Sequence, residues 1–179
     1  HYTAKLTASD GTARDYFGGS VAISGDTVVV GAYGAESVYV FVKPANGWKS
    51  TSTYAAKLTT LGGAKLFGSS VVLKGDTVAV GAPQDDVGDN YDQGAVYIFD
   101  KPSDNWITTS NYTARLTAQD GTLNDHFGGS VAMTDDTIVV GATGVFYYSN
   151  HAAYIYKKPL NGWATTSNYT AKLTASGTN

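Results

Sequence analysis

The sequence lacks cysteine and has few charged residues. With no Cys among 179 residues, the chain has no disulfide framework and no thiolate metal site. Charged residues make up 15% and the net charge is -3, so we expect no nucleic-acid partner. No apolar run approaches the roughly 20 residues that span a bilayer, so we expect no membrane insertion. Hydrophobic residues, at 42%, still suffice for a folded core.

Signatures of catalysis are missing as well. The chain has no Gly-x-Ser-x-Gly nucleophile elbow and no His-Glu-x-x-His helix. Its three histidines are scattered, and His126 occupies a place that Tyr16 and Leu66 hold in other copies of a repeat described below. The residues therefore predict a protein that is not an enzyme and that needs no cofactor.

Internal repetition dominates what is present. One phrase occurs four times, 52 to 58 residues apart, at Tyr2–Thr7, Tyr54–Thr59, Tyr112–Thr117 and Tyr169–Thr174. A second phrase begins with Phe-Gly and occurs at Phe17–Val21, Phe67–Val71 and Phe127–Val131. A third ends in Gly-Ala and occurs at Asp26–Ala32, Asp76–Ala82 and Asp136–Ala142. Three tandem copies in matching order identify a repeat protein.

Each repeat reads as four short strands. Val, Ile, Tyr, Phe and Thr dominate, and no stretch has sustained helical periodicity. Gly25 and Gly75 lie in tight hairpin turns between apolar runs, and Asp135 is expected to adopt the same backbone in the third copy. The prediction is an all-β chain of three tandem four-stranded antiparallel β-propeller blades, with a β-helix or stacked solenoid as the minor alternative.

The Phe-Gly and Gly-Ala phrases resemble the FG-GAP repeat, the blade unit of integrin α-subunit propellers and of many secreted microbial proteins. Copy two carries both parts of the name, at Phe67-Gly68 and Gly81–Pro83. The resemblance implies an extracellular or cell-surface location and an innermost strand that starts at each Phe-Gly. It divides the chain into an orphan outer strand and loop (1–16), blade 1 (17–66), blade 2 (67–126) and blade 3 (127–179).

Calcium-binding members of that family carry an acidic loop between the first two strands, and this chain has only a two-residue turn there. The resemblance is therefore to a metal-free microbial subtype. A weak calcium candidate lies in the long loop of blade 2, at Asp85, Asp86, Asp89 and Asp92. Asp15 and Asp125 recur before the Phe-Gly phrase, where we expect them to cap backbone N–H groups in turns.

Two further sets of residues are candidates for surface chemistry. Asn111 and Asn168 begin Asn-Tyr-Thr sequons at equivalent positions, so they are candidates for N-glycosylation. A polar and aromatic loop is a candidate surface for binding glycans or surface proteins. Its candidate residues are Tyr147, Tyr148, Asn150 and His151.

Three blades are fewer than the four to eight that close a propeller, so apolar sheet faces must be covered by something else. The chain is predicted to continue into further blades, to pair into a six-bladed ring, or to join head to tail. The candidates for assembly contacts are Tyr2, Leu6, Tyr169 and Leu173. A structural or adhesive module that self-associates is the leading hypothesis, and a carbohydrate- or protein-binding propeller is the alternative.

Overall fold

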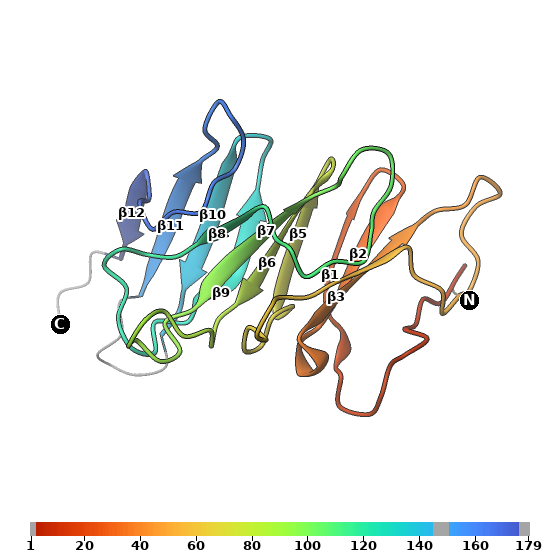
Figure 1. Cartoon of the computed structure of the whole chain (residues 1–179), viewed down its shortest axis with the longest axis horizontal. Helices are drawn as coiled ribbons and strands as arrows, with labels where there is room; N and C mark the ends of the chain where they lie inside the picture. Colours follow the sequence, from red (N-terminus) through yellow and green to blue (C-terminus); the bar gives the residue numbers. More distant parts are fainter. Residues whose placement is uncertain (1–2, 145–150, 176–179) are drawn as a thin grey trace.

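The computed structural model describes residues 3–144 and 151–175 and confirms the predicted fold class. Its strands form three separate sheets of four antiparallel strands, and the sheets lie side by side in a row (Figure 1). Blade 1 contains β1 (Phe17–Ser24), β2 (Thr27–Ala32), β3 (Ser37–Val42) and β4 (Ala56–Leu58). Blade 2 contains β5 (Ser70–Lys74), β6 (Thr77–Ala82), β7 (Ala95–Asp100) and β8 (Ala114–Leu116). Blade 3 contains β9 (Phe127–Met133), β10 (Thr137–Ala142), β11 (Ala152–Lys157) and β12 (Ala171–Thr174).

The two middle strands of blade 2 are buried on both faces, as their Val- and Ile-rich composition predicts. In β7, for example, the five residues from Ala95 to Phe99 are all buried. One short 3-10 turn, η1 (Tyr33–Ala35), interrupts the strands, and the described residues contain no α-helix. Blade 2 lies in the middle of the row, with blade 1 and blade 3 at its two ends (Figure 1).

The first hairpin of each blade tests the predicted turn. Gly25 and Gly75 have φ values of +55° and +56°, the left-handed conformation that glycine adopts at low cost. The prediction for Asp135 is wrong, because this residue does not take a positive φ. The third turn instead closes with a bond from Thr134 N to Thr137 O, and the carboxylate of Asp136 accepts hydrogen bonds from both threonine hydroxyls.

A sharp bend precedes every innermost strand. The residue before Phe-Gly has a positive φ in all three blades, at Tyr16 (+54°), Leu66 (+57°) and His126 (+53°). The glycine that follows is also left-handed, with φ between +91° and +94°. The carbonyl oxygens of Gly68 and Gly128 face the preceding blade, where each accepts a hydrogen bond from a serine.

Candidate functional site: the joint between blades

The contact between successive blades is the most extensively built site in the structure. Each blade has a front face, which packs on the blade before it, and a back face, which packs on the blade after it. The joint between blades 1 and 2 buries the back face of blade 1 and the front face of blade 2 in one apolar core. The back-face residues are Val29, Val38, Val40, Ala56 and Leu58, and each is at most 1% exposed. The front-face residues include Phe67, Val71, Leu73, Tyr97, Phe99 and Trp106.

The joint between blades 2 and 3 repeats this arrangement. Equivalent back-face residues of blade 2 are fully buried against the front face of blade 3. They are Ala79, Val96, Ile98, Ala114 and Leu116. Trp106 and Trp163 are buried within these cores, at 7% and 6% exposure, so the tryptophans pack between blades.

A serine on each back face fixes the register of the joint. The hydroxyl of Ser20 donates a 2.7 Å hydrogen bond to the carbonyl oxygen of Gly68 in blade 2, and Ser70 makes the same bond to Gly128 in blade 3. Gly31 and Gly81 lie beside these serines in the adjacent strand. A Cβ atom at either glycine would overlap the same carbonyl oxygen, so only glycine allows the blades to approach this closely.

The outer edge of each joint is closed by backbone hydrogen bonds. Leu58 forms a parallel bridge with Thr109, in which Thr59 N donates to Thr109 O at 3.1 Å and Thr109 N donates to Lys57 O at 3.0 Å. Leu116 bridges Thr166 in the same way. The outer strand of one blade is thus paired with the segment before the outer strand of the next.

Each blade also holds a cation against a tyrosine on its front face. The Lys57 ammonium lies 5.1 Å from the centre of the Tyr39 ring and 2.7 Å from Asp10, and that ion pair lowers the pKa of the Asp10 carboxyl. In blade 3, Lys172 lies over Tyr154 and pairs with Asp120 at 2.7 Å. These pairs connect a blade to the loop that follows the preceding outer strand.

Blade 2 builds the same cluster from a different carboxylate. Gly62 stands where Asp10 and Asp120 stand in the other copies, so no acid is available there. Asp85 from the long loop takes the role, 2.6 Å from the Arg115 guanidinium and 2.7 Å from the Tyr97 hydroxyl. Burial raises the pKa of Tyr97, which keeps this phenol a hydrogen-bond donor. Sequence spacing gives no sign of this cluster, because its members lie 12 to 30 residues apart.

The back face of blade 3 carries the same residue types but lies uncovered. Leu173 is 55% exposed, whereas the equivalent Leu58 and Leu116 are at most 1% exposed. The other members of this face are only partly buried, namely Val139, Ala153, Ile155 and Ala171. Ser130 and Gly141 face each other across β9 and β10, in the positions that contact the next blade elsewhere.

The front face of blade 1 is uncovered in part. Val21 and Ile23 are 66% and 65% exposed, whereas the equivalent Val71 and Leu73 are 9% and 6% exposed. The outer part of this face is covered by residues 3–9, here called the leader segment, whose Leu6 and Ala8 pack against the core of blade 1. The row of blades therefore ends in two complementary apolar surfaces.

The acidic loop of blade 2 is held together by ion pairs. Asp85 bonds to Arg115, while Asp86 and Asp92 lie 2.8 Å and 3.7 Å from Lys65. Asp89 is exposed. Among residues 3–144 and 151–175 no group of three or more His, Cys, Asp or Glu side chains is arranged to hold a metal ion. A calcium ion in this loop stays a prediction.

The recurring acids before Phe-Gly cap turns, as expected. The Asp15 carboxylate accepts bonds from the backbone N–H and the hydroxyl of Thr12, at 2.6 Å and 2.7 Å. Asp125 repeats both bonds with Thr122, at 2.7 Å and 2.9 Å.

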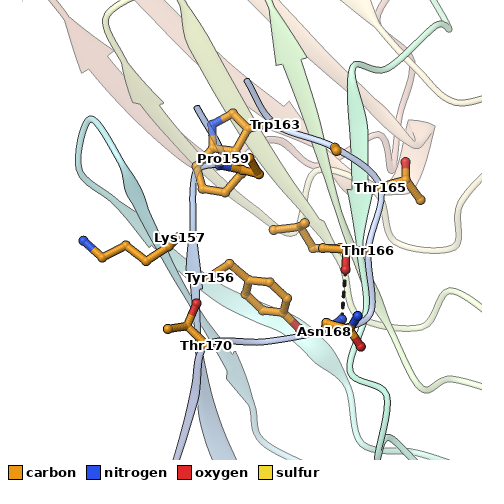
Figure 2. A pocket seen from close by; sticks show the side chains of 10 residues that line it. Tyr156, Lys157, Pro159, Trp163, Thr165, Thr166, Asn168 and Thr170 are labelled. Atoms are coloured by element: carbon orange, nitrogen blue, oxygen red, sulfur yellow. Dashed lines mark hydrogen bonds between the residues drawn. The ribbon is translucent and has the colours of Figure 1, made fainter. Parts of the chain in front are cut away.

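The two sequon asparagines lie at equivalent exposed bends on the outer rim. The backbone N–H of Asn168 donates to the hydroxyl of Thr166 at 3.0 Å, and Asn111 does the same with Thr109. Asn168 borders a groove of about 330 Å³, and Figure 2 shows it beside Thr166, away from Trp163 and Pro159 at the other end. Similar grooves flank Trp106 and Trp48, so this rim feature is repeated in every blade.

The remaining candidates are divided between described and undescribed residues. Of the ligand-loop set, Tyr147, Tyr148 and Asn150 lie outside the described residues, and His151 is exposed just before β11. Of the assembly set, Tyr2 lies outside them, whereas Leu6 and Tyr169 are partly buried. The Tyr169 ring lies 5.1 Å from that of Tyr154.

Comparison with known proteins identifies the repeat. A sequence model of the FG-GAP repeat matches residues 2–41, 53–99 and 111–156, which is more than half of the chain. The chain belongs to the FG-GAP repeat family. In these FG-GAP blades, the Phe-Gly glycine provides the carbonyl that accepts the serine bond, and the Gly-Ala glycine gives it room.

One solved structure with the same arrangement is the crystal structure of the computationally designed Ika4 protein. The TM-score is 0.54 at 14% sequence identity, over 99% of this chain and 81% of that one. At this identity the likeness concerns the fold alone. No curated protein matches the chain in sequence. No helix among the described residues has the length and apolar character to span a membrane.

Proposed function

We propose that this FG-GAP protein is a non-catalytic structural module, located outside the cell, that self-associates head to tail through its blade faces. The supporting observation is the match between the two ends of the row. The back face of blade 3 carries the residues that are buried at both internal joints, and the front face of blade 1 carries their partners. A second copy is therefore a partner of the right shape and chemistry.

The contact is heterologous, because it joins two different surfaces of the same chain. Such a contact closes into a ring when the rotation between copies allows it, and otherwise continues as a fibre. Two copies supply six blades, which lies within the range that closes a propeller. An adhesive role belongs to the same proposal, since either assembly would present the loops of many copies in an ordered array.

Sedimentation velocity over a range of concentrations tests the proposal. We expect the wild-type chain to form larger species as concentration rises. Leu173→Asp places a charge on the back face of blade 3 and should shift the chain toward monomers, because burying an unpaired carboxylate is costly. Leu160→Asp is the matched control, since Leu160 is fully exposed outside the stacking faces and its change should have no effect. Equal association of all three proteins would contradict the proposal.

We also propose N-glycans at Asn111 and Asn168. Both asparagines are exposed on the outer rim in the described structure, where two joints are already formed, so a glycan there is compatible with stacking. Glycans would add a hydrophilic coat to the outer rim of an assembly.

A further inference from the structure

The leader segment occupies the position of an outer strand whose other three strands are not among the described residues. Thr7 N donates to Thr51 O and Thr51 N donates to Lys5 O, both at 3.0 Å, and Lys5 N donates to the Ser50 hydroxyl at 3.0 Å. The same two backbone hydrogen bonds occur at the joint between blades 1 and 2, where Thr59 N donates to Thr109 O and Thr109 N donates to Lys57 O. Leu6 packs in the same way as Leu58 and Leu116, against the front face of the following blade.

The leader segment is also a sequence copy of the last outer strand. Residues 2–9 read YTAKLTAS, and residues 169–176 read the same eight letters. β4 and β8 each pair with a strand of their own blade and with a segment of the next blade. The leader segment and β12 each make only one of these two contacts. The leader segment pairs with Thr51 but has no antiparallel partner among the described residues, whereas β12 pairs with β11 but bridges no following segment there.

Stacking a second copy on blade 1 would bring both segments to one place. The β12 strand of the incoming copy would reach Ser50 and Thr51, where the leader segment already lies. Because the two segments have identical sequences, either can make the bonds to Thr51, but only one fits. One of them must leave when a joint forms.

The contacts decide which segment leaves. β12 is held to β11 along four residue pairs, and Lys172 anchors it to Asp120. The leader segment is held by two backbone bonds, one bond to Ser50 and the packing of Leu6 and Ala8. Losing the leader contacts disrupts less structure than losing those of β12.

We propose that the leader segment is an internal substitute for β12 of a second copy, which covers the front face of blade 1 in the single chain and is displaced when copies join. This inference rests on the proposed self-association. The leader segment thereby competes with assembly and raises the concentration at which joints form.

Removal of residues 1–9 tests the inference, and it keeps Asp10 and its ion pair with Lys57. If circular dichroism shows intact strands, the truncated chain should associate at a concentration roughly tenfold or more below that of the wild type, because no leader bonds have to break. Leu6→Asp in the full-length chain loosens the leader segment without a truncation and should act in the same direction.

A peptide of sequence YTAKLTAS provides the second readout. Added to the truncated chain, it should occupy Ser50 and Thr51 and suppress association, whereas a peptide with Asp at its Leu position should not. Leu173→Asp in the truncated background should also abolish association, which distinguishes specific joints from aggregation of an exposed face.

The outcomes separate the two proposals. If no variant associates at any concentration, the proposed function itself fails. If the wild type associates but truncation leaves the concentration dependence unchanged or weakens association, self-association stands and the substitute role of the leader segment is wrong. Weaker association on truncation would indicate that the leader segment is donated to the neighbouring copy.

Discussion

Ser70 and Gly128 are joined by a 2.7 Å hydrogen bond from the serine hydroxyl of blade 2 to the glycine carbonyl of blade 3. Ser20 and Gly68 repeat it one joint earlier. In this chain the Phe-Gly phrase of one blade supplies the acceptor, and the Gly-Ala phrase of the preceding blade leaves space for it. At the end of the row, Ser130 and Gly141 hold the same positions, and no further blade follows among the described residues.

The first prediction compares Gly81 with Gly141. The two glycines hold equivalent positions, but only Gly81 lies against a following blade among the described residues. Gly81→Ala should destabilise the fold by about 3 kcal/mol, because the new methyl group would overlap the backbone of Gly128. Gly141→Ala should cost less than about 1 kcal/mol, because its Cβ would meet only the Ser130 side chain, which can rotate away. Urea denaturation measures both, and equal losses would contradict this account of the joint.

Gly141→Ala has a second expected effect, on assembly. In a stacked assembly this methyl group would meet the Gly18 carbonyl of the next copy, by analogy with Gly81 and Gly128. Sedimentation should therefore show weaker association for a variant whose fold is nearly as stable as wild type. Unimpaired association would mean that copies do not contact each other through this face.

The second prediction concerns the ion pair in blade 2. Asp85→Ala leaves the Arg115 guanidinium largely buried without its carboxylate, and we expect a loss of about 2 kcal/mol in the free energy of unfolding. Asp89→Ala in the same loop is the control and should change stability by less than about 0.5 kcal/mol, since its side chain is exposed. Comparable losses for both variants would show that the loop as a whole, and not the pair, matters.

The third prediction concerns acid. Hydrogen bonds from Thr137 and an ion pair with Lys157 lower the pKa of Asp136 from 3.8 to about 2. A carboxyl with a lower pKa in the folded state stabilises the fold fully above about pH 4, and this contribution is lost as the pH falls toward 2. Thermal melting between pH 5 and 2 should therefore show a shallower decline for Asp136→Asn than for the wild type. Parallel curves would rule out this contribution.

The fourth prediction concerns glycosylation. Material from a glycosylating host should lose mass on treatment with an amidase that releases N-glycans, and Asn111→Gln with Asn168→Gln should remove that loss. Thr53 occupies the equivalent bend in blade 1 and provides an internal control, because it lacks the asparagine. An unchanged intact mass on treatment would contradict glycosylation at both positions.

Sequence repetition predicted the blades well because strand composition and turn spacing are local properties. The four strands per blade and the Asp15 turn both follow from short stretches of sequence. The turn at Asp135 was predicted wrongly because the repeat suggested one backbone for all copies. There the side chain of Asp136 closes the turn in a different way.

The contacts between blades could not be predicted from the sequence. Nothing in the spacing shows that Leu58 bridges Thr109, or that Asp85 replaces the acid missing at Gly62. Both depend on how one sheet packs on the next. The count of three blades predicts apolar end faces, and comparing equivalent residues such as Leu58 and Leu173 shows which side chains are uncovered.

Imaging the native protein by electron cryomicroscopy tests the central claim most directly. The account predicts closed discs or continuous fibres in which the Ser130 and Gly141 surface of one copy lies against Gly18 of the next, with the geometry of the Ser20 and Gly68 joint. Single chains at every concentration, or assemblies joined through other surfaces, would contradict it.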